Sequence, residues 1–221
     1  MPIESRVFIA IPHGDTLHPE VLRSVVEMIN HPSGCKLNFQ MRQGHLASET
    51  KNYLAEQFLT SDSTHLLLMD ADNPPLNNPL TLAALGHDIV GCPTPIYKDE
   101  AMELKTFPIT WNVYRADGEE YRPIVCGKGI EECDAIGAGC IMISRRVVET
   151  LKPLFLWQQK KKTRALGDDL AFCQRALRHG FNIYAAWTHL CSHYHQTDLL
   201  KMMQAGMDLV EAFGTPKEAS E

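Results

Sequence analysis

Two aspartates separated by one residue follow an apolar segment of the sequence. In HLLLMDADNPP, residues 65–75, the apolar run ends at Asp70 and Asp72, and a segment typical of a turn follows at once. Neighbouring carboxylates repel each other, and a divalent cation that prefers oxygen ligands, Mg²⁺ or Mn²⁺, relieves this repulsion. Such an ion keeps positions for phosphate oxygens, so a diphosphate-bearing substrate is the natural third component. The alternative is a polar turn, because Asp, Asn and Pro are common turn formers.

A second acidic pair begins a predicted helix. Asp168 and Asp169 open the segment DDLAFCQRALRH, residues 168–179, whose apolar positions have helical spacing. Carboxylates in a first helical turn are favoured by the helix dipole, so capping is one interpretation. The other is general-base chemistry, since a buried acid beside a second acid has a raised pKa.

Glycines mark two further places where a ligand could approach the backbone. IAIPHG, residues 9–14, ends a predicted strand at Pro12, His13 and Gly14. Gly137 and Gly139 stand near the start of AIGAGCIMIS, residues 135–144. Glycine allows close approach of a ligand or unusual backbone dihedrals, so both segments are candidates for the binding site.

The elements that must position these residues alternate between strands and helices. Strands are predicted over 6–11, 36–41, 65–69 and 88–93, and helices over 18–29, 48–59 and 79–85. This alternation predicts an α/β fold with a mostly parallel sheet and helices on both faces. Ligands bind beyond the carboxyl ends of the strands in such folds, which is where Asp70 and Asp72 stand.

The second half of the sequence departs from this alternation and then returns to it. Residues 96–133 predict irregular structure and antiparallel strands. A strand over 135–144, helices over 145–151 and 168–179, a strand over 181–187 and a C-terminal helix over 197–213 follow. We expect a single domain over residues 1–213 and a flexible polar tail over 214–221.

Composition narrows the classes of function. The chain has 221 residues and a net charge of −6, which argues against a general nucleic-acid coat. No apolar run is long enough for a membrane span, and the first residues do not resemble a signal peptide. Seven cysteines without a CxxC pair predict reduced thiols in the cytoplasm.

Two cysteine patterns raise the question of zinc. The segment CSHYH, residues 191–195, hints at a zinc site, but a fourth ligand at suitable spacing is not evident, which argues against structural zinc. The series Cys126, Cys133 and Cys140 is interpreted as buried or idle thiols.

Taken in order, these motifs resemble those of a GT-A-fold glycosyltransferase of the family-2-like type, which uses nucleotide sugars. The matching segments are IAIPHG, LLLMDADNPP, AIGAGCIMISRRVVETL and GDDLAFCQRALRHGFNIY, and the resemblance covers most of residues 6–195. It implies a GT-A-like (Rossmann-like), mostly parallel central sheet with a small antiparallel portion on the acceptor side. It also implies transfer of a sugar from a nucleotide-diphosphate sugar to an acceptor hydroxyl, with Mn²⁺ or Mg²⁺ as cofactor.

The resemblance assigns roles to individual residues. Asp70 and Asp72 match the DxD pair that holds the metal and diphosphate, and His193 matches the third metal ligand, with His195 as the alternate. Asp169 matches the acid of the ED motif, the general base of inverting members, and Asp168 stands where the family more often has Glu. Lys51 and Asn52 stand where an Arg-Asn pair is common. The residues implied in donor binding are Pro12, His13, Gly14, Arg42, Lys51, Asn52, Asp70, Ala71, Gly137 and Gly139.

The acceptor and two rival functions stay open at this point. A glycan, a small molecule or a hydroxylated nucleic-acid base would fit, the last in the cytoplasm of a virus-infected host cell. The basic run KKKTR, residues 160–164, is either a solvated loop or a lid that closes on an anionic group. The rivals are a non-catalytic sugar-nucleotide or glycan-binding module and a nucleotidyltransferase. Nucleotidyltransferases usually carry a Gly-rich N-terminal signature with Arg and Lys, which IAIPHGDTLHPE lacks.

Overall fold

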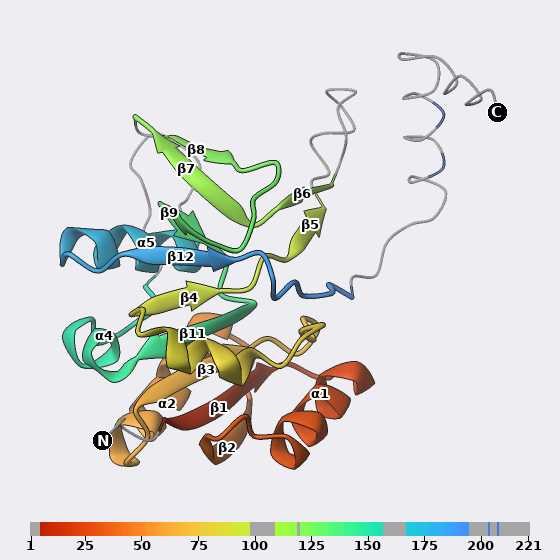
Figure 1. The fold of residues 1–221 in the computed structure, drawn as a ribbon, viewed down its shortest axis with the longest axis vertical. Coiled ribbons are helices and arrows are strands. Elements are labelled where there is room, and N and C mark those ends of the chain that lie inside the picture. Colours follow the sequence, from red (N-terminus) through yellow and green to blue (C-terminus); the bar gives the residue numbers. More distant parts are fainter. Residues whose placement is uncertain are drawn as a thin grey trace.

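A seven-stranded sheet forms the centre of the computed structural model (Figure 1). The structure describes residues 5–97, 109–118, 120–156 and 167–194, together with Met203 and Met207. In spatial order the strands are β2 (Lys36–Gln43), β1 (Arg6–His13), β3 (His65–Met69), β11 (Cys140–Ser144), β4 (Ile89–Gly91), β12 (Ile183–Ala186) and β9 (Ile130–Cys133). Only β11 and β9 run against the other strands, so the prediction of a mostly parallel sheet is confirmed.

Helices cover both faces of this sheet, as predicted. Along β1, residues 7, 9 and 11 contribute to one buried cluster and residues 8 and 10 to the other, because side chains alternate along a strand. The first cluster contains residues of α1 (Pro19–Asn30) and the 3₁₀ helix η1 (Pro79–Leu85). The second contains residues of α2 (Ala47–Thr60), α4 (Arg145–Thr150) and α5 (Asp168–Arg178).

The predicted antiparallel portion is also present. β7 (Val113–Asp117) pairs with β8 (Glu120–Pro123) and with β10 (Ala135–Ile136). β5 (Pro95–Tyr97) pairs with β6 (Ile109–Trp111). These strands lie beyond the β12–β9 edge of the main sheet in Figure 1.

One predicted strand is divided in the structure. Residues 135–144 were expected to be continuous, but β10 belongs to the small sheet and β11 to the main sheet. Gly137 and Gly139 lie between β10 and β11. They allow the chain to pass from the small sheet to the main sheet where side chains of other segments lie close to the backbone. A Cβ on Gly137 would lie 2.6 Å from Asn112 Nδ2, and one on Gly139 would lie 2.4 Å from Asn73 Oδ1.

Several predictions fall on residues outside the described part of the chain. They are the KKKTR run, His195, the tail over 214–221 and most of the C-terminal helix over 197–213, of which Met203 and Met207 are described as helical. Within the described residues, no helix has the length and apolar character that crossing a bilayer requires.

Candidate functional site

The turn after β3 places Asp70 and Asp72 at the carboxyl edge of the sheet. The Asp70 backbone N–H donates to the Gly139 carbonyl oxygen at 2.7 Å, which joins this turn to the chain entering β11. The Ala71 carbonyl oxygen accepts from the His18 N–H at 2.8 Å, which joins it to the start of α1. The backbone therefore places the acidic pair at the end of a strand, as the sequence predicts.

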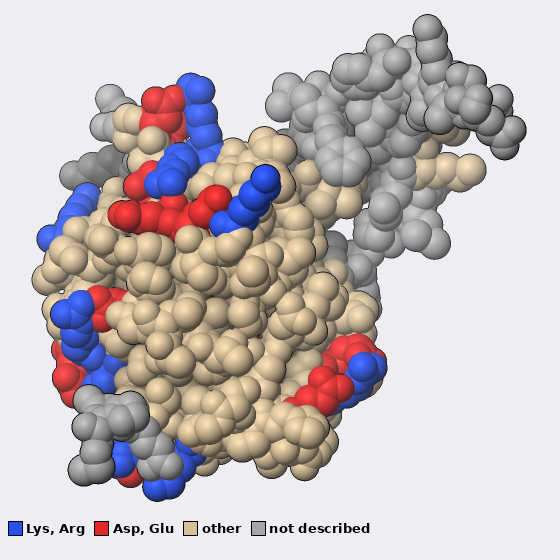
Figure 2. All heavy atoms as spheres, viewed as in Figure 1, with Lys and Arg blue, Asp and Glu red and all other residues tan. Residues whose placement is uncertain are grey.

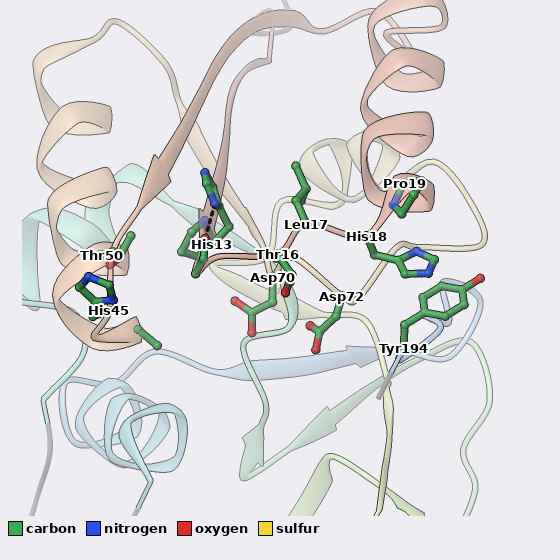
Figure 3. Close-up of a pocket in the computed structure, with 15 residues that line it drawn as sticks. His13, Thr16, Leu17, His18, Pro19, His45, Thr50, Asp70, Asp72 and Tyr194 are labelled. Carbon is green, nitrogen blue, oxygen red and sulfur yellow. Dashed lines mark hydrogen bonds between the residues drawn. The ribbon is translucent and has the colours of Figure 1, made fainter. Parts of the chain in front are cut away.

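A cavity of about 910 Å³ lies against this turn, within the usual size range of small-molecule sites. Figure 3 shows both carboxylates between His45 and Thr50 on one side and His18 and Tyr194 on the other. Six of the predicted site residues line the cavity: Pro12, His13, Gly14, Asp70, Ala71 and Asp72. The other lining residues are Thr16, Leu17, His18, Pro19, Gly44, His45, Ala47, Thr50 and Tyr194.

The charged side chains among these lining residues are acidic. Neither Lys nor Arg lines the cavity within the described part of the chain. A diphosphate group placed here would therefore be repelled by Asp70 and Asp72 unless a cation came with it. The lining thus favours a ligand that binds together with a metal ion.

Lys51 joins the two acidic motifs. Its Nζ lies 3.3 Å from Asp169 Oδ1 and 3.5 Å from Asp70 Oδ1, and its side chain is only 5% exposed. Burial alone would lower the pKa of Lys51, but the charges of Asp169, Asp70 and Asp168 outweigh burial and raise it. Lys51 is therefore charged and does not line the cavity, and its role in donor binding stays a prediction.

Asp70 carries a perturbed carboxyl group. Burial raises its pKa to about 6, although 29% of the side chain remains exposed. The charge of Lys51 opposes this rise, and the charges of Asp169 and Asp72 add to it. Burial is therefore the main cause of the raised pKa, and a cation bound beside Asp70 would favour its ionised form.

The acids at the start of α5 occupy unequal environments. Asp169 Oδ1 accepts from Lys51 and Oδ2 accepts from the Ala138 N–H at 2.9 Å, so both oxygens are engaged. Asp168 Oδ1 accepts from the Asp169 N–H at 3.1 Å. Burial, followed by the charge of Asp169, raises the pKa of Asp168. Asp169 is thus held through both of its oxygens, and Asp168 has a raised pKa.

His193 faces Asp72 from the segment that follows β12. This segment runs beside the acidic turn, with the Tyr194 N–H donating to the Asp72 carbonyl oxygen at 3.0 Å. His193 Nδ1 lies 2.8 Å from the Pro95 carbonyl oxygen, which can only accept, so Nδ1 carries the proton. In the neutral ring, Nε2 therefore presents its lone pair toward Asp72 Oδ2, 3.6 Å away.

Two electron-pair donors facing each other in this way need a proton or a metal ion between them. Contact with the Asp72 carboxylate raises the pKa of His193, which is the outcome when a proton is taken up. The carbonyl contact on the far ring nitrogen is the support that metal-binding histidines usually have. Asp72 and His193 therefore have donor atoms of the kinds that a divalent cation binds, and Asp70 lies in the same turn as Asp72.

Four other predicted residues have structural contacts rather than a place in the cavity lining. Asn52 exchanges hydrogen bonds with the Phe155 backbone at 2.8 and 2.9 Å. The exposed Arg42 lies over the Tyr53 ring, 4.5 Å from its centroid. Gly137 and Gly139 shape the β10–β11 crossing and do not line the cavity.

A stacked pair in the cavity wall was missed by sequence reasoning. The rings of His18 and Tyr194 lie 3.6 Å apart with an interplanar angle of 10° (Figure 3). His18 caps α1 through Nδ1, which accepts from the Glu20 N–H at 3.3 Å. A signal existed for each residue, since His18 precedes a helix-starting proline and Tyr194 stands between the two candidate histidines. Nothing in the sequence brings the two together.

Many solved structures have folds that resemble this one, and two of them are examples. The crystal structure of A197 from STIV is 18% identical, covers 86% of each chain and has a TM-score of 0.57. The crystal structure of UDP-glucose pyrophosphorylase complexed with UDP-glucose is 10% identical and has a TM-score of 0.52. That match covers 93% of this chain and 98% of the other. No family model and no curated protein matches the sequence. At these identities the similarity concerns the fold, and it agrees with the α/β class that the sequence predicts.

Proposed function

We propose that this chain is a metal-dependent glycosyltransferase that moves a sugar from a nucleotide-diphosphate sugar to an acceptor hydroxyl. One observation carries the proposal. Two acidic motifs about a hundred residues apart meet at Lys51, and one of them faces a cavity that has acids but neither Lys nor Arg in its described lining. This arrangement suits a substrate whose phosphates arrive with a cation, next to a separate acid that can accept a proton.

Each part of the site has a distinct task in this proposal. Asp70, Asp72 and His193 hold Mn²⁺ or Mg²⁺. When bound, the ion supplies positive charge that stabilises the leaving diphosphate. The turn over residues 12–14 and the stacked rings of His18 and Tyr194 surround the nucleoside.

The acids at the start of α5 handle the proton of the acceptor. As the acceptor hydroxyl attacks the anomeric carbon, a carboxylate takes its proton. Asp168 has the raised pKa that suits this role, and Asp169 holds Lys51 and the Ala138 N–H in place. A single displacement would invert the anomeric configuration, and NMR of the product should show this. The acceptor is a glycan, a small molecule or a hydroxylated nucleic-acid base.

A nucleotidyltransferase is the second candidate, and the fold similarity to UDP-glucose pyrophosphorylase favours it. Such an enzyme must bind a nucleoside triphosphate, which carries more negative charge than a nucleotide sugar. The lack of Lys and Arg in the described lining of the cavity makes glycosyl transfer the better supported of the two.

The decisive experiment separates the products of the two reactions. The chain is incubated with Mn²⁺ and either UDP- or GDP-sugars, or a nucleoside triphosphate and a sugar 1-phosphate. Release of nucleoside diphosphate from the sugar nucleotides supports glycosyl transfer, whereas pyrophosphate release from the second mixture supports nucleotidyl transfer.

Two variants show whether either product comes from this site. Asp72→Ala should abolish the activity, whereas Asp117→Ala, which removes an exposed carboxylate on β7, should retain it. Binding of nucleotide sugar without turnover in both mixtures would point to the non-catalytic module and contradict the proposed reaction.

A further inference from the structure

Three cysteines far apart in the sequence meet in the core beneath the acidic turn. Cys92 follows β4, Cys140 begins β11, and Cys191 lies after β12. Their sulfur atoms all lie within 4.8 Å of one another. The side chains are 0%, 0% and 3% exposed, and none forms a disulfide.

Backbone hydrogen bonds fix the positions of these cysteines. The Cys92 N–H donates to the Cys140 carbonyl oxygen at 2.8 Å, and the Cys191 N–H donates to the Pro93 carbonyl oxygen at 3.0 Å. Cys191 also forms a β-bridge with Pro75, just beyond the acidic turn. The sulfur atoms therefore converge because three separate segments are held together, not because one flexible loop folds back on itself.

The spacing of the sulfur atoms suits a metal ion. Thiolates at a typical zinc–sulfur distance of about 2.3 Å are about 3.8 to 4.0 Å apart in tetrahedral or trigonal geometry. The observed arrangement reaches this spacing with shifts below one ångström. The hydroxyl of Thr94, itself 2% exposed, donates to the Cys92 carbonyl oxygen at 3.2 Å and also lies within reach of the Cys191 sulfur.

We propose that Cys92, Cys140 and Cys191 form a three-thiolate site for a thiophilic d¹⁰ metal ion of the class of Zn²⁺ and Cu⁺. On binding, each thiol loses its proton to solvent and forms one sulfur–metal bond. Three thiolates leave a net charge of −1 with Zn²⁺ and −2 with Cu⁺. The sequence pattern groups Cys140 with Cys126 and Cys133, which favours the interpretation of Cys140 as a buried or idle thiol. Neither Cys126 nor Cys133 belongs to the proposed site.

The site would brace the segment that carries His193. Cys191 precedes His193 by two residues, and Cys140 follows Gly139, whose carbonyl accepts from Asp70. An ion bound to all three cysteines would therefore hold the 190–194 segment against the sheet. This inference does not depend on the proposed function, because none of the three cysteines lines the cavity.

Cobalt binding to the full-length wild-type chain tests the site without any variant. The chain is purified under reducing, oxygen-free conditions, stripped of metal and titrated with Co²⁺. We expect one equivalent to produce the near-ultraviolet thiolate-to-cobalt charge-transfer band, which Co²⁺ on the carboxylates of the acidic site cannot produce. Zn²⁺ should abolish the band and Mn²⁺ should not. Absence of the band would overturn the proposal.

Variants identify the ligands. Cys191→Ala should weaken Co²⁺ binding by at least about a hundredfold. Loss of a residue that only supports a metal ligand costs at most about a hundredfold, so a larger effect indicates a ligand. Cys133→Ala, a buried cysteine in the opposite core cluster, should bind as the wild type does. Equal binding by Cys191→Ala and the wild type would contradict the three-thiolate site.

Discussion

Two regions of this molecule pair aspartates with a cation in opposite ways. At the carboxyl end of β3, Lys51 is shared between Asp70 and Asp169, and the pKa of Asp70 is raised to about 6. At the opposite end of the sheet, Asp88 pairs with Arg146 and accepts from Ser144 Oγ at 2.8 Å. The hydrogen bond from Arg146 is the main reason that the pKa of Asp88 is lowered.

The difference separates an acid that serves the fold from acids that serve a site. Asp88 has a full complement of donors, so its charge is stabilised in the folded state. Asp70 and its neighbours share one buried cation, so the folded state carries excess negative charge there. Unfavourable electrostatics of this kind persist at functional sites, where a ligand supplies the missing charge.

The surface shows the same contrast. On the face in Figure 2, the described Lys and Arg side chains lie beside Asp and Glu near the outline, and the centre has little charge. On α1, for example, Arg23 contacts both Glu20 and Glu27. Charges on this face are balanced locally, unlike those around Asp70.

Removing the shared cation should have the largest effect. Lys51→Met leaves two half-buried acids without their partner, and we expect a loss of about 2–3 kcal/mol in the free energy of unfolding at pH 7.5, below the range for a fully buried pair. The loss should shrink at pH 5, because Asp70 is then protonated. Urea unfolding at both pH values measures it, with the exposed Lys128→Met as control. An equal loss at both pH values would mean that Lys51 acts through the contact of its side chain with Phe155.

The two acids of α5 should separate catalysis from support. Asp168→Asn should lower the turnover of the proposed reaction at least about a hundredfold while leaving stability nearly unchanged. Asp169→Asn should lower both, because Lys51 and the Ala138 N–H lose a charged partner. Steady-state kinetics and thermal unfolding of both variants give the comparison. Full activity in Asp168→Asn would transfer the role of general base to Asp169.

The sequence predicted the main sheet well because its signals are local. The alternation of buried positions in β1 and the apolar run of β3 are visible within a few residues, and the predicted boundaries of most elements lie close to the observed ones. The division of residues 135–144 was missed because its cause is distant. Asn73 and Asn112 come from other segments and lie against the two glycines.

The candidate site was predictable in part for the same reason. Asp70, Asp72 and Asp169 belong to motifs, and the structure brings them together. The role of Lys51 depends on a contact between residues 118 positions apart in the chain, and the sulfur cluster unites three segments. Such contacts have no signature in a single sequence.

Neutralising Asp70 should stabilise the fold. Its folded pKa is raised above the ordinary value of 3.8, so ionised Asp70 opposes folding above pH 6 and this penalty disappears as the pH falls toward 3.8. Asp70→Asn should therefore gain about 1–2 kcal/mol at pH 7.5. The same change should abolish binding of Mn²⁺. Thermal unfolding from pH 5 to pH 8 should show a gain that grows with pH, and a loss of stability at pH 7.5 would contradict the excess of negative charge.

Replacing Asp88 should lower the free energy of unfolding, opposite to the effect at Asp70. This is the smallest of the expected effects on stability. Asp88→Asn should lose less than about 1 kcal/mol at pH 7, because the Arg146 side chain is 70% exposed and solvent screens the pair. The folded pKa of Asp88 is lowered, so its contribution is present above the unfolded pKa and is lost as the pH falls through the folded pKa. The loss should therefore stay constant from pH 8 to pH 5, where the gain in Asp70→Asn changes.

Salt separates the two regions further. Asparagine keeps an oxygen that can accept from Ser144 Oγ but loses one of the two acceptors for Arg146, so the loss in Asp88→Asn reports the whole interaction with Arg146. Sodium chloride at 0.5 M should reduce this exposed interaction more than it reduces the gain in Asp70→Asn, where Lys51 is 5% exposed. Equal screening of both effects would show that the acids around Lys51 are as open to solvent as Arg146. The distinction between Asp88, whose charge is compensated within the fold, and Asp70, whose charge calls for a bound cation, would then fail.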